Sequence, residues 1–593
     1  MKEVIVVLDN GGQYCHLIAT KVRNEHHVYS EIKQPDVDEK ELLGAKGIIL
    51  SGSPFSLYNE NKPNFNPKIL ELGIPVLGIC YGNYLVSHYL GGEVAPSEKK
   101  EYGSAILQKK KESVLLEGLE NEEVVWMSHG DTIKSIPNGF AVIGSTENCE
   151  FAAIENEEKK IFGVQFHPEV VDTEKGNLVL GNFVKKICGC SGEWKISDYI
   201  SEKIDSLKKE VGEKKVLLLV SGGVDSTVCA SLLAKAIPLE NLFCLHIDNG
   251  LMRKNESADV EKNLGDIPNF KLVDASQRFI NRLENIFEPE QKRKIIGNTF
   301  IDVANDEIKN IGLEDWLLGQ GTIYPDTIES GATKHADVIK THHNRVDIIQ
   351  EMIKEGKIVE PIKELYKEEV RELGEKLGLA EKFVWRHPFP GPGLGVRLLC
   401  SNGESENFEE IEKSLAEHKK EFEFKILPCK SVGVKGDERS YEHAVIISGE
   451  WEYKKLEKES TRIVNEVRGI NRAVYLLPGQ EIKSIELIKA YTTKERLAKL
   501  READAIVMEE LENAGLMRKV WQCPTVLAPV NFNGCGEAVI LRPVYSTIAM
   551  TAKFADLPKE VVEKMKNRLL EIKGIGAVLF DITHKPPGTI EWE

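Results

Sequence analysis

Short apolar runs that end in glycine-containing or polar turns recur through the first half of the chain. Five of them are found at residues 4–8, 47–50, 74–79, 216–220 and 242–248. Their apolar residues occupy consecutive positions, as is typical of parallel strands covered on both faces. Residues 83–90 and 227–236, which follow two of the runs, have helix-compatible spacing. The pattern predicts α/β architecture built on parallel sheets.

The last third of the chain repeats one order of elements. The first copy has strands at 426–434, 444–447 and 467–475, and the second has strands at 526–528, 538–541 and 572–580. A helix lies before the last strand of each copy. The order strand, strand, helix, strand predicts a duplicated small α/β module with helices on one sheet face. Chance similarity between two α/β units is the alternative interpretation.

Length, charge and cysteine content narrow the functional classes. A chain of 593 residues exceeds one hydrophobic core, and the patterns divide it into segments 1–190, 191–400, 401–490 and 491–593. The net charge of −17 disfavours a nucleic-acid partner. No apolar run reaches the roughly 18–20 residues of a membrane span, and no signal peptide opens the chain, so we expect a cytoplasmic protein. Eleven cysteines without a C-x-x-C pair indicate buried free thiols.

The turn after residues 216–220 has the composition of an anion-binding loop. It consists of Ser221, Gly222, Gly223, Val224, Asp225 and Ser226. Glycines let backbone N–H groups approach an anion, the following helix directs its positive dipole end toward the loop, and the hydroxyls add donors. The common phosphate loop G-x-x-x-x-G-K-S/T is absent. An ordinary strand-to-helix turn is the alternative interpretation.

Cys80 lies between the third apolar run and the helix that follows it. Such an elbow exposes a side chain, and a helix N-terminus stabilises the thiolate, which is the nucleophilic form. Downstream, His167 and Glu169 follow another strand and, as residues two apart in an extended segment, point the same way. A thiol, a base and an acid that orients the base form a nucleophilic triad where the fold brings them together. For Cys80 taken alone, a core cysteine is the alternative.

Two further segments of the middle third carry groups suited to a nucleotide. Open α/β sheets bind ligands outside the carboxyl ends of their strands, so adenine and ribose are expected beside the strand end that contains Ile247. Gly321 belongs to a polar segment at 318–326, and Lys340 to another at 339–344. The charge of Lys340 suits neutralisation of a leaving pyrophosphate.

Other features of this third are explained at least as well by a structural role as by a role in binding. His342 and His343 are adjacent but have no matching Cys or His partners, so they are weak candidates for metal ligands. The basic cluster at 290–297 is equally typical of a solvated helix face. The Pro-Gly run at 388–393 excludes a helix or a central strand and indicates a rigid connector or an active-site wall.

Residues 1–190 resemble the class I glutamine amidotransferases, whose domain has a flavodoxin-like fold. Three motifs carry the resemblance in chain order: S-G-S-P at 51–54, G-I-C-Y-G around Cys80, and H-P-E at 167–169. The resemblance implies that Cys80 attacks the side-chain amide of glutamine, that His167 serves as acid and base, and that Glu169 orients it. It assigns the oxyanion hole to the backbone N–H groups of Ser53 and Tyr81.

This chain departs from that family at two places. Ser53 stands where glycine is common, and Asn83-Tyr84 stands where the family usually has Met-Gln. The family's glutamine is expected to touch the amino-acid end of the substrate. The departures therefore bear on glutamine affinity and leave the identity of the nucleophile unchanged.

The loop S-G-G-V-D-S resembles the pyrophosphate loop of the N-type ATP pyrophosphatases, which have an adenine-nucleotide α-hydrolase-like fold and cut ATP between the α and β phosphates. Four more motifs resemble the GMP synthetase branch of that family: G-Q-G-T-I-Y-P-D, K-T-H-H-N, R-H-P-F-P-G-P-G-L and the terminal K-P-P-G-T-I-E-W-E. The resemblance covers nearly the whole chain. It implies that Mg-ATP adenylylates O2 of xanthosine monophosphate (XMP) and that ammonia from glutamine then displaces AMP to give GMP.

The same resemblance implies binding residues by position. It implies that the loop residues, together with Ile247, Gly321 and Lys340, bind ATP and its pyrophosphate. It also implies that Asp225 binds Mg²⁺. The residues expected to bind XMP are Arg293, Asp437, Gln522, Lys585 and Glu591. Arg and Lys suit a phosphate dianion, whereas carboxylates and an amide suit a base edge that is rich in donors and acceptors.

The resemblance also bears on assembly. Many bacterial members carry one carboxyl-terminal module, which they use for dimerisation, whereas the eukaryotic type carries two. Parts of the single-module pattern are divided here between the copies, with 430–441 in the first and 585–593 in the second. We therefore expect the two-module type and a monomer. Its partners are expected to be glutamine, ATP and XMP, with neither nucleic acid nor membrane.

Two classes of alternative function stay open at this point. Another amide-forming adenylase, such as an asparagine or NAD synthetase, shares the loop, although asparagine synthetases use an amino-terminal cysteine and position 2 here is Lys2. A tRNA-thiolating relative needs a catalytic cysteine pair, which is absent. A nucleotide-sensing binding protein with a silent glutaminase is compatible with Ser53 and Tyr84.

Overall fold

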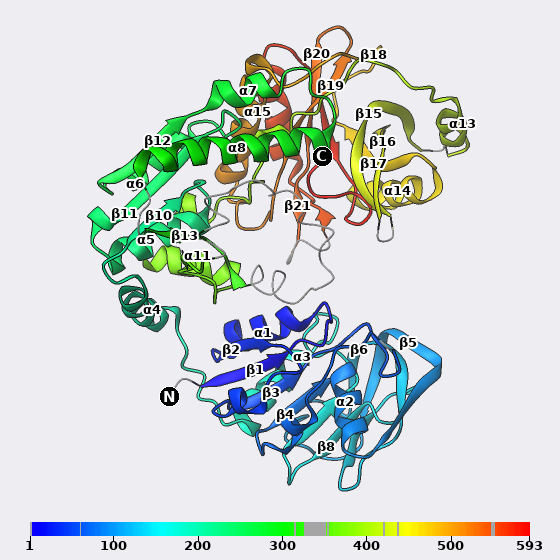
Figure 1. Ribbon diagram of the computed structural model, residues 1–593. Helices are drawn as coiled ribbons and strands as arrows, with labels where there is room; N and C mark the ends of the chain where they lie inside the picture. Colours follow the sequence, from blue (N-terminus) through cyan, green and yellow to red (C-terminus); the bar gives the residue numbers. More distant parts are fainter. Residues whose placement is uncertain are drawn as a thin grey trace. The chain divides into compact units, whose positions relative to one another are not determined.

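The computed structural model describes residues 3–59, 61–312, 316–324, 352, 355–418, 421–435, 438–546 and 552–593 and forms two compact units, Met1–Tyr199 and Ile200–Glu593 (Figure 1). Four residues that the sequence singled out lie outside the described residues: Lys340, His342, His343 and Asp437. Within the described residues, no helix is both long and apolar enough to cross a bilayer. All eleven cysteines are free, and nine of them are buried.

The first unit contains a nine-stranded sheet that is parallel in one half. Its strands in spatial order are β2 (Tyr29–Lys33), β1 (Val4–Leu8), β3 (Gly47–Leu50), β4 (Val76–Ile79), β9 (Ile161–Val164), β8 (Ala153–Asn156), β7 (Ala141–Ser145), β5 (Glu93–Lys109) and β6 (Glu122–Ser135). Neighbours from β2 to β9 pair in parallel and the other pairs are antiparallel. The helices are α1 (Cys15–Asn24), α2 (Tyr81–Tyr89) and α3 (Gly176–Gly181). The predicted parallel strands are thus confirmed.

The second unit contains a five-stranded parallel sheet with a topological switch point. Its order is β12 (Asn269–Asp274), β11 (Leu242–Asp248), β10 (Lys215–Leu219), β13 (Trp316–Gly319) and β14 (Ile358–Val359). Its helices are α4 (Ile196–Val211), which leads into it, α5 (Val224–Ala236), α6 (Glu256–Leu264), α7 (Ser276–Arg282), α8 (Pro289–Ile311), α11 (Lys367–Lys376) and α12 (Glu381–Val384). Strand order reverses between β10 and β13, and ligands of open α/β sheets bind at such a point.

A seven-stranded sheet in the same unit contains the predicted duplication. Its order is β15 (Glu423–Lys435), β16 (Glu438–Ser448), β17 (Ile470–Leu476), β23 (Ile575–Asp581), β20 (Gly536–Leu541), β19 (Thr525–Phe532) and β18 (Ile485–Leu487). In each copy the first two strands pair antiparallel and the second and third pair in parallel. The copies meet where β17 and β23 pair antiparallel. They therefore form one continuous sheet with an internal near-twofold arrangement.

The two faces of this sheet are covered differently. Four helices belong to this part: α13 (Glu409–Glu417), α14 (Tyr453–Glu466), α15 (Lys494–Asn513) and α16 (Lys559–Leu570). Val445 and Ile447 of β16 share a core with apolar residues of the last three helices, whereas Ala444 and Ile446 share a second core with Trp592. This alternation follows from the period of two along a strand. The prediction of helices on one sheet face is confirmed.

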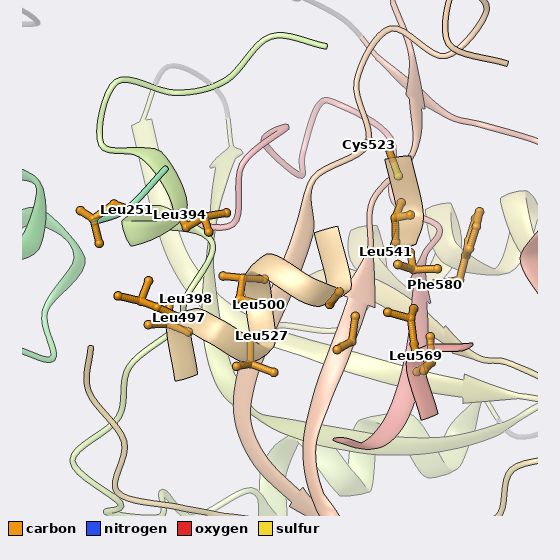
Figure 2. Packing of buried hydrophobic residues seen from close by; sticks show 14 of the residues in the cluster. Leu251, Leu394, Leu398, Leu497, Leu500, Cys523, Leu527, Leu541, Leu569 and Phe580 are labelled. Carbon is orange, nitrogen blue, oxygen red and sulfur yellow. The ribbon is translucent and has the colours of Figure 1, made fainter. Parts of the chain in front are cut away.

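One apolar core joins the parallel sheet to the carboxyl-terminal sheet. Figure 2 shows Leu251, which follows β11, close to Leu394, which directly follows the Pro-Gly run, and Leu398 close to Leu497 and Leu500 of α15. The same cluster continues to the strands β19, β20 and β23. Because close-packed cores transmit strain, we expect a displacement of one sheet to act on the other.

A buried carboxylate fastens the seam between the two copies. Asp581, at the end of β23, accepts hydrogen bonds from Arg472 of the first copy and Arg542 of the second, each over 3.0 Å. It also accepts one from the indole N–H of Trp592 over 2.9 Å. The side chains of Asp581 and both arginines are fully buried. A buried charge that loses its partner is strongly destabilising, so this ion cluster holds the copies and the end of the chain together.

Replacing this carboxylate by an amide tests its contribution to stability. We expect Asp581→Asn to lower the free energy of unfolding by about 3–5 kcal/mol, because two buried guanidinium groups lose their counter-charge. Urea unfolding followed by circular dichroism measures the change. The matched control is Glu563→Gln on the exposed side of α16, which should stay within about 0.5 kcal/mol of the wild type. Equal stability of Asp581→Asn and the wild type would contradict the proposed lock.

Candidate active sites

Cys80 occupies a strained turn between β4 and α2. Its φ of 54° lies in the left-handed region, which residues with side chains rarely adopt. A Cβ at Gly78 would lie 2.5 Å from the carbonyl oxygen of Gly82, and one at Gly82 would lie 2.3 Å from that of Leu50. Only glycine therefore fits on both sides of the nucleophile. Close backbone packing explains the motif G-I-C-Y-G.

His167 follows β9 and is held by Glu169. The imidazole Nδ1 lies 2.6 Å from Glu169 Oε1, and the Glu169 side chain is fully buried. Burial lowers the pKa of His167, but the Glu169 carboxylate and the hydrogen-bonded Cys80 outweigh burial and hold the pKa well above its usual 6.5. The imidazole thus keeps a proton beside the thiol. The structure brings the three predicted triad residues together.

The turn at 51–54 lies against the triad. A Cβ added to Gly52 would lie 3.1 Å from His167 Cε1 and 3.8 Å from Cys80 Cβ. Within the described residues, the backbone N–H groups of Ser53 and Tyr81 donate to no protein acceptor. Ser53 Oγ caps the same turn by accepting from a backbone N–H two residues on. Both N–H groups therefore stay available as the predicted donors of an oxyanion hole.

Strand β6 lines the same site, and sequence reasoning missed it. The thiol of Cys80 lies 3.6 Å from the carbonyl oxygen of Ser128. The buried hydroxyl of Tyr84 donates to the carbonyl oxygen of Asp131 over 2.6 Å and accepts from Gln165 over 2.9 Å. Tyr84 is therefore a satisfied part of the wall. The sequence feature that could have indicated this strand is the polar stretch S-H-G-D at 128–131, which lies within a strand whose positions alternate between buried and partly exposed.

Ser221, Gly222 and Gly223 form a turn after β10, as the sequence predicted, whereas Val224, Asp225 and Ser226 form the first turn of α5, which begins three residues before the predicted start at 227. Gly222 has a φ of 81°, and a Cβ there would lie 2.7 Å from the Val260 side chain, so this position requires glycine. Ser226 Oγ donates to the carbonyl oxygen of Gly223 over 3.1 Å and lies 3.4 Å from Ser221 Oγ. The hydroxyls therefore lie at the N-terminus of α5, where the free N–H groups of a helix favour an anion.

Two other predicted nucleotide residues are placed by the neighbouring strands. Gly321, which follows β13, packs on the loop, because a Cβ there would lie 3.4 Å from Ser226 N and 3.5 Å from Asp225 Cβ. Ile247 is the second-last residue of β11 and is buried in the large core of the unit. The switch point therefore brings Gly321 to the loop, whereas Ile247 supports the adjacent strand.

Asp225, the predicted Mg²⁺ ligand, is paired with Lys367 at the start of α11. The ammonium nitrogen lies 2.7 and 2.6 Å from the two carboxylate oxygens. Proteins commonly hold Mg²⁺ through one or two carboxylates together with substrate phosphates, so a carboxylate beside the loop suits the ion. Among the described residues, no cluster of three or more His, Cys, Asp or Glu could hold a metal by itself. Sequence reasoning missed Lys367, which lies 142 residues from Asp225 and belongs to no motif.

The tail, residues 585–593, is docked in the second unit. Gln522 Nε2 donates to Glu591 Oε1 over 2.8 Å, and Arg293 of α8 contacts the carbonyl oxygen of the last residue. Of the described XMP candidates, Lys585 and Glu591 belong to the tail, and Gln522 and Arg293 contact it. The structure thus brings four residues that are far apart in the sequence to one segment.

Arg397 holds the tail carboxylate and was not predicted. Its Nη2 and Nε lie 2.9 and 3.1 Å from the two oxygens of Glu591, and its own side chain is fully buried. A bidentate arginine fixes both the position and the plane of a carboxylate. The sequence does contain a signal for it, since Arg397 is the single charged residue in the apolar stretch 394–399. A buried arginine needs an acidic partner, so this pattern indicates an ion pair.

Comparison with known proteins identifies two family matches along the chain. Residues 6–187 match the class-I glutamine amidotransferase family, and residues 409–487 and 509–592 both match the family described as GMP synthase C terminal domain. The probable glutamine-hydrolyzing GMP synthase of Leptospira interrogans is 44% identical over 99% of both chains. That of Syntrophomonas wolfei is 41% identical over 100% of both chains.

A further relative shows that the chain length varies. The glutamine-hydrolyzing GMP synthase of Clostridium botulinum is 44% identical and is matched over 99% of its own length, yet it covers 82% of this chain. Part of this chain thus has no counterpart in that relative. The full-length matches are to bacterial proteins, so the two-module organisation is not confined to eukaryotes. With full-length identity above 40% to these relatives, the chain belongs to the family of glutamine-hydrolysing GMP synthases.

Proposed function

We propose that this chain makes GMP from XMP, glutamine and ATP. The observation that carries the proposal is that one chain joins a complete thiol triad to a pyrophosphate-type loop and a docked tail. The triad supplies ammonia, the loop holds the leaving part of ATP, and the tail receives the nucleotide acceptor. The family membership supports the same reaction.

The glutaminase step uses the three residues of the first unit. The Cys80 thiolate attacks the amide carbon of glutamine, and the oxyanion that forms accepts hydrogen bonds from the N–H groups of Ser53 and Tyr81. His167 gives its proton to the departing nitrogen, so ammonia leaves and a thioester remains. Water activated by the neutral imidazole then releases glutamate and restores the thiol. Glu169 holds the imidazole in its orientation throughout.

The synthetase step uses the second unit. O2 of XMP attacks the α-phosphorus of ATP, the bond to the bridging oxygen breaks, and pyrophosphate leaves into the loop Ser221 to Ser226. Ammonia then attacks C2 of the adenylylated purine, and AMP leaves with the former O2. We assign ATP contacts also to Ile247, Gly321 and Lys340, and XMP contacts to Arg293, Asp437, Gln522, Lys585 and Glu591. Bound at Asp225, Mg²⁺ would supply neutralisation of the phosphate charge.

The wider organisation is proposed on the same basis. We assign residues 1–190 to the glutaminase, 191–400 to the ATP pyrophosphatase, and 401–490 and 491–593 to the two carboxyl-terminal copies. We place the protein in the cytoplasm, where its eleven unpaired cysteines would stay reduced. Small molecules are its proposed partners, and neither nucleic acid nor membrane is among them.

A product assay with a nucleophile variant tests the reaction. With glutamine, Mg-ATP and XMP, we expect equal amounts of GMP, AMP and pyrophosphate. Cys80→Ala should lose glutamine-dependent GMP formation by about a thousandfold, whereas synthesis from ammonium chloride should continue, because the second unit is unaltered. The exposed Cys535→Ala serves as control. Release of ADP and phosphate, or binding without products, would refute the assignment.

The pKa of His167 makes the pH profile of glutamine hydrolysis a second test. Because Glu169 raises this pKa, the imidazolium persists above pH 6.5, and its stabilisation is lost as the pH rises through the raised pKa. Glu169→Gln removes the charge that raises it. The alkaline limb of kcat/KM should therefore move to lower pH, and the maximum should fall. An alkaline limb at an unchanged pH would show that another group titrates there.

The strand pairing between the two copies bears on the oligomeric state of the protein. Because β17 of the first copy pairs with β23 of the second, the chain itself covers a sheet edge that one module would leave open. We therefore propose a monomer of 66.5 kDa. Sedimentation velocity at micromolar concentration without ligands measures this, and a tight dimer would contradict it.

A further inference from the structure

A row of alternating charges, each buried or largely buried, begins at the loop Ser221 to Ser226. The guanidinium of Arg386 contacts both the carbonyl oxygen of Gly222 in the loop and the carboxylate of Glu256 at the start of α6. The second oxygen of Glu256 accepts from the backbone N–H of Arg253 over 2.9 Å. Any change in the position of the loop backbone therefore acts on Arg386, and through Glu256 on the segment that carries Arg253.

The row ends at the tail. Arg397 binds both oxygens of Glu591, and Gln522 donates to one of them over 2.8 Å. Gln522 Nε2 also lies 3.2 Å from the carbonyl oxygen of Pro388. The carboxylate of Glu591 is thus oriented by protein groups before a nucleotide arrives. Arg397 has no solvent contact, so its charge depends on these partners.

One carboxylate of α15 connects the two ends. Asp504 Oδ2 lies 3.4 Å from Arg253 Nε, and Asp504 Oδ1 lies 3.5 Å from Arg397 Nη1. The Phe389 ring lies against both guanidinium groups, 4.4 Å from that of Arg253 and 5.1 Å from that of Arg397. Asp504 is 2% exposed. The middle of the row therefore consists of a single buried anion between two cations.

The contacts of Asp504 with Arg253 and Arg397 are the longest ion pairs in the row. Hydrogen bonds to charged groups are usually shorter than about 3.0 Å, and the contacts of Arg397 with Glu591 approach that range, whereas both contacts of Asp504 exceed it. Within the described part of the chain, Nε and Nη2 of Arg253 make no hydrogen bond. Burial also lowers the pKa of Arg253 to about 10. The Asp504 carboxylate therefore lies farther from the guanidinium groups of Arg253 and Arg397 than the best ion-pair geometry allows. A small displacement of either arginine toward Asp504 would strengthen the attraction.

The segments that carry these groups are packed together. Leu251 lies two residues before Arg253, and Leu398 directly follows Arg397; both belong to the core that includes Leu500, four residues before Asp504 (Figure 2). Residues in such a core shift as a body. A displacement that begins at the loop can therefore reach the tail without loss of packing.

We propose that Asp504 couples the two nucleotide subsites, so that ATP at the loop and XMP at Glu591 strengthen each other's binding. Asp504 acts as a positioning residue: it draws Arg253 and Arg397 toward each other when either end of the row is fixed by a ligand. This inference rests on the proposed function and adds to it a mutual tightening of the two nucleotides, which favours the fully occupied site. Coupling between sites is reciprocal, so each ligand must tighten the other by the same factor.

Isothermal titration of the full-length protein measures this factor. The probes are XMP and Mg²⁺ with α,β-methylene-ATP, which cannot be cut between its α and β phosphates. In the wild type, we expect each ligand to lower the dissociation constant of the other by about tenfold. In Asp504→Asn the factor should fall below about two. Because the factor is a ratio, a general loss of affinity for one ligand cancels from it.

Matched variants separate coupling from simple damage. Glu510→Gln changes another buried carboxylate of α15, which pairs with Arg568 outside the row, and it should keep the wild-type factor. Arg253→Lys keeps the backbone contact to Glu256 but shortens the side chain, so it should lose coupling even where Asp504→Asn fails to fold. Circular dichroism and thermal unfolding verify that each variant is folded.

The outcomes separate two kinds of failure. A wild type that binds both ligands without mutual tightening overturns the inference and leaves the proposed function standing. Wild-type coupling that survives in Asp504→Asn or, where that variant does not fold, in Arg253→Lys also overturns it. A wild type that binds neither XMP nor the ATP analogue refutes the proposed function itself.

Discussion

The carboxylate of Asp581 receives hydrogen bonds from both copies of the carboxyl-terminal module and from Trp592 in the tail. A terminal segment is normally frayed, because few contacts repay the loss of its conformational freedom. Here the tail is retained by a buried ion cluster and by an indole that is fully enclosed in the sheet's second core. The position of Glu591, one residue earlier, follows from this attachment. The proposed acceptor site thus depends on a charge that belongs to the seam of the sheet.

The two catalytic units use different physical means to place their residues. In the first unit, Cys80 and His167 stand at the ends of the adjacent parallel strands β4 and β9, so the sheet register alone brings them together. Strain at Cys80 and the glycines beside it finish the arrangement locally. In the second unit, the candidate acceptor residues come from α8, from the segment between α15 and β19, and from the tail. Their arrangement needs long-range ion pairs in a shared core.

Duplication of the module did not duplicate the acceptor site. Both copies have the same strand pairing, yet the tail follows only the second copy, and the segment 430–441 belongs only to the first. One composite site can therefore form in each chain. The Clostridium botulinum relative, which covers 82% of this chain, shows that the family also uses a shorter chain. The seam at β17 and β23 makes the second copy a structural partner of the first.

The sequence alone determined the local chemistry: the elbow at Cys80, the histidine and carboxylate two residues apart, the loop 221–226 and the repeated order of strands. These features depend on backbone sterics and on periodicity, which act between near neighbours and leave a visible pattern. Only the tertiary structure decided that Lys367 pairs with Asp225, 142 residues away, and that Arg397 holds Glu591 across 194 residues. Whether a charge is buried, and which opposite charge it meets, depends on how distant segments enclose it. No local pattern contains that information, because the cost of burial arises only once the fold has removed the water.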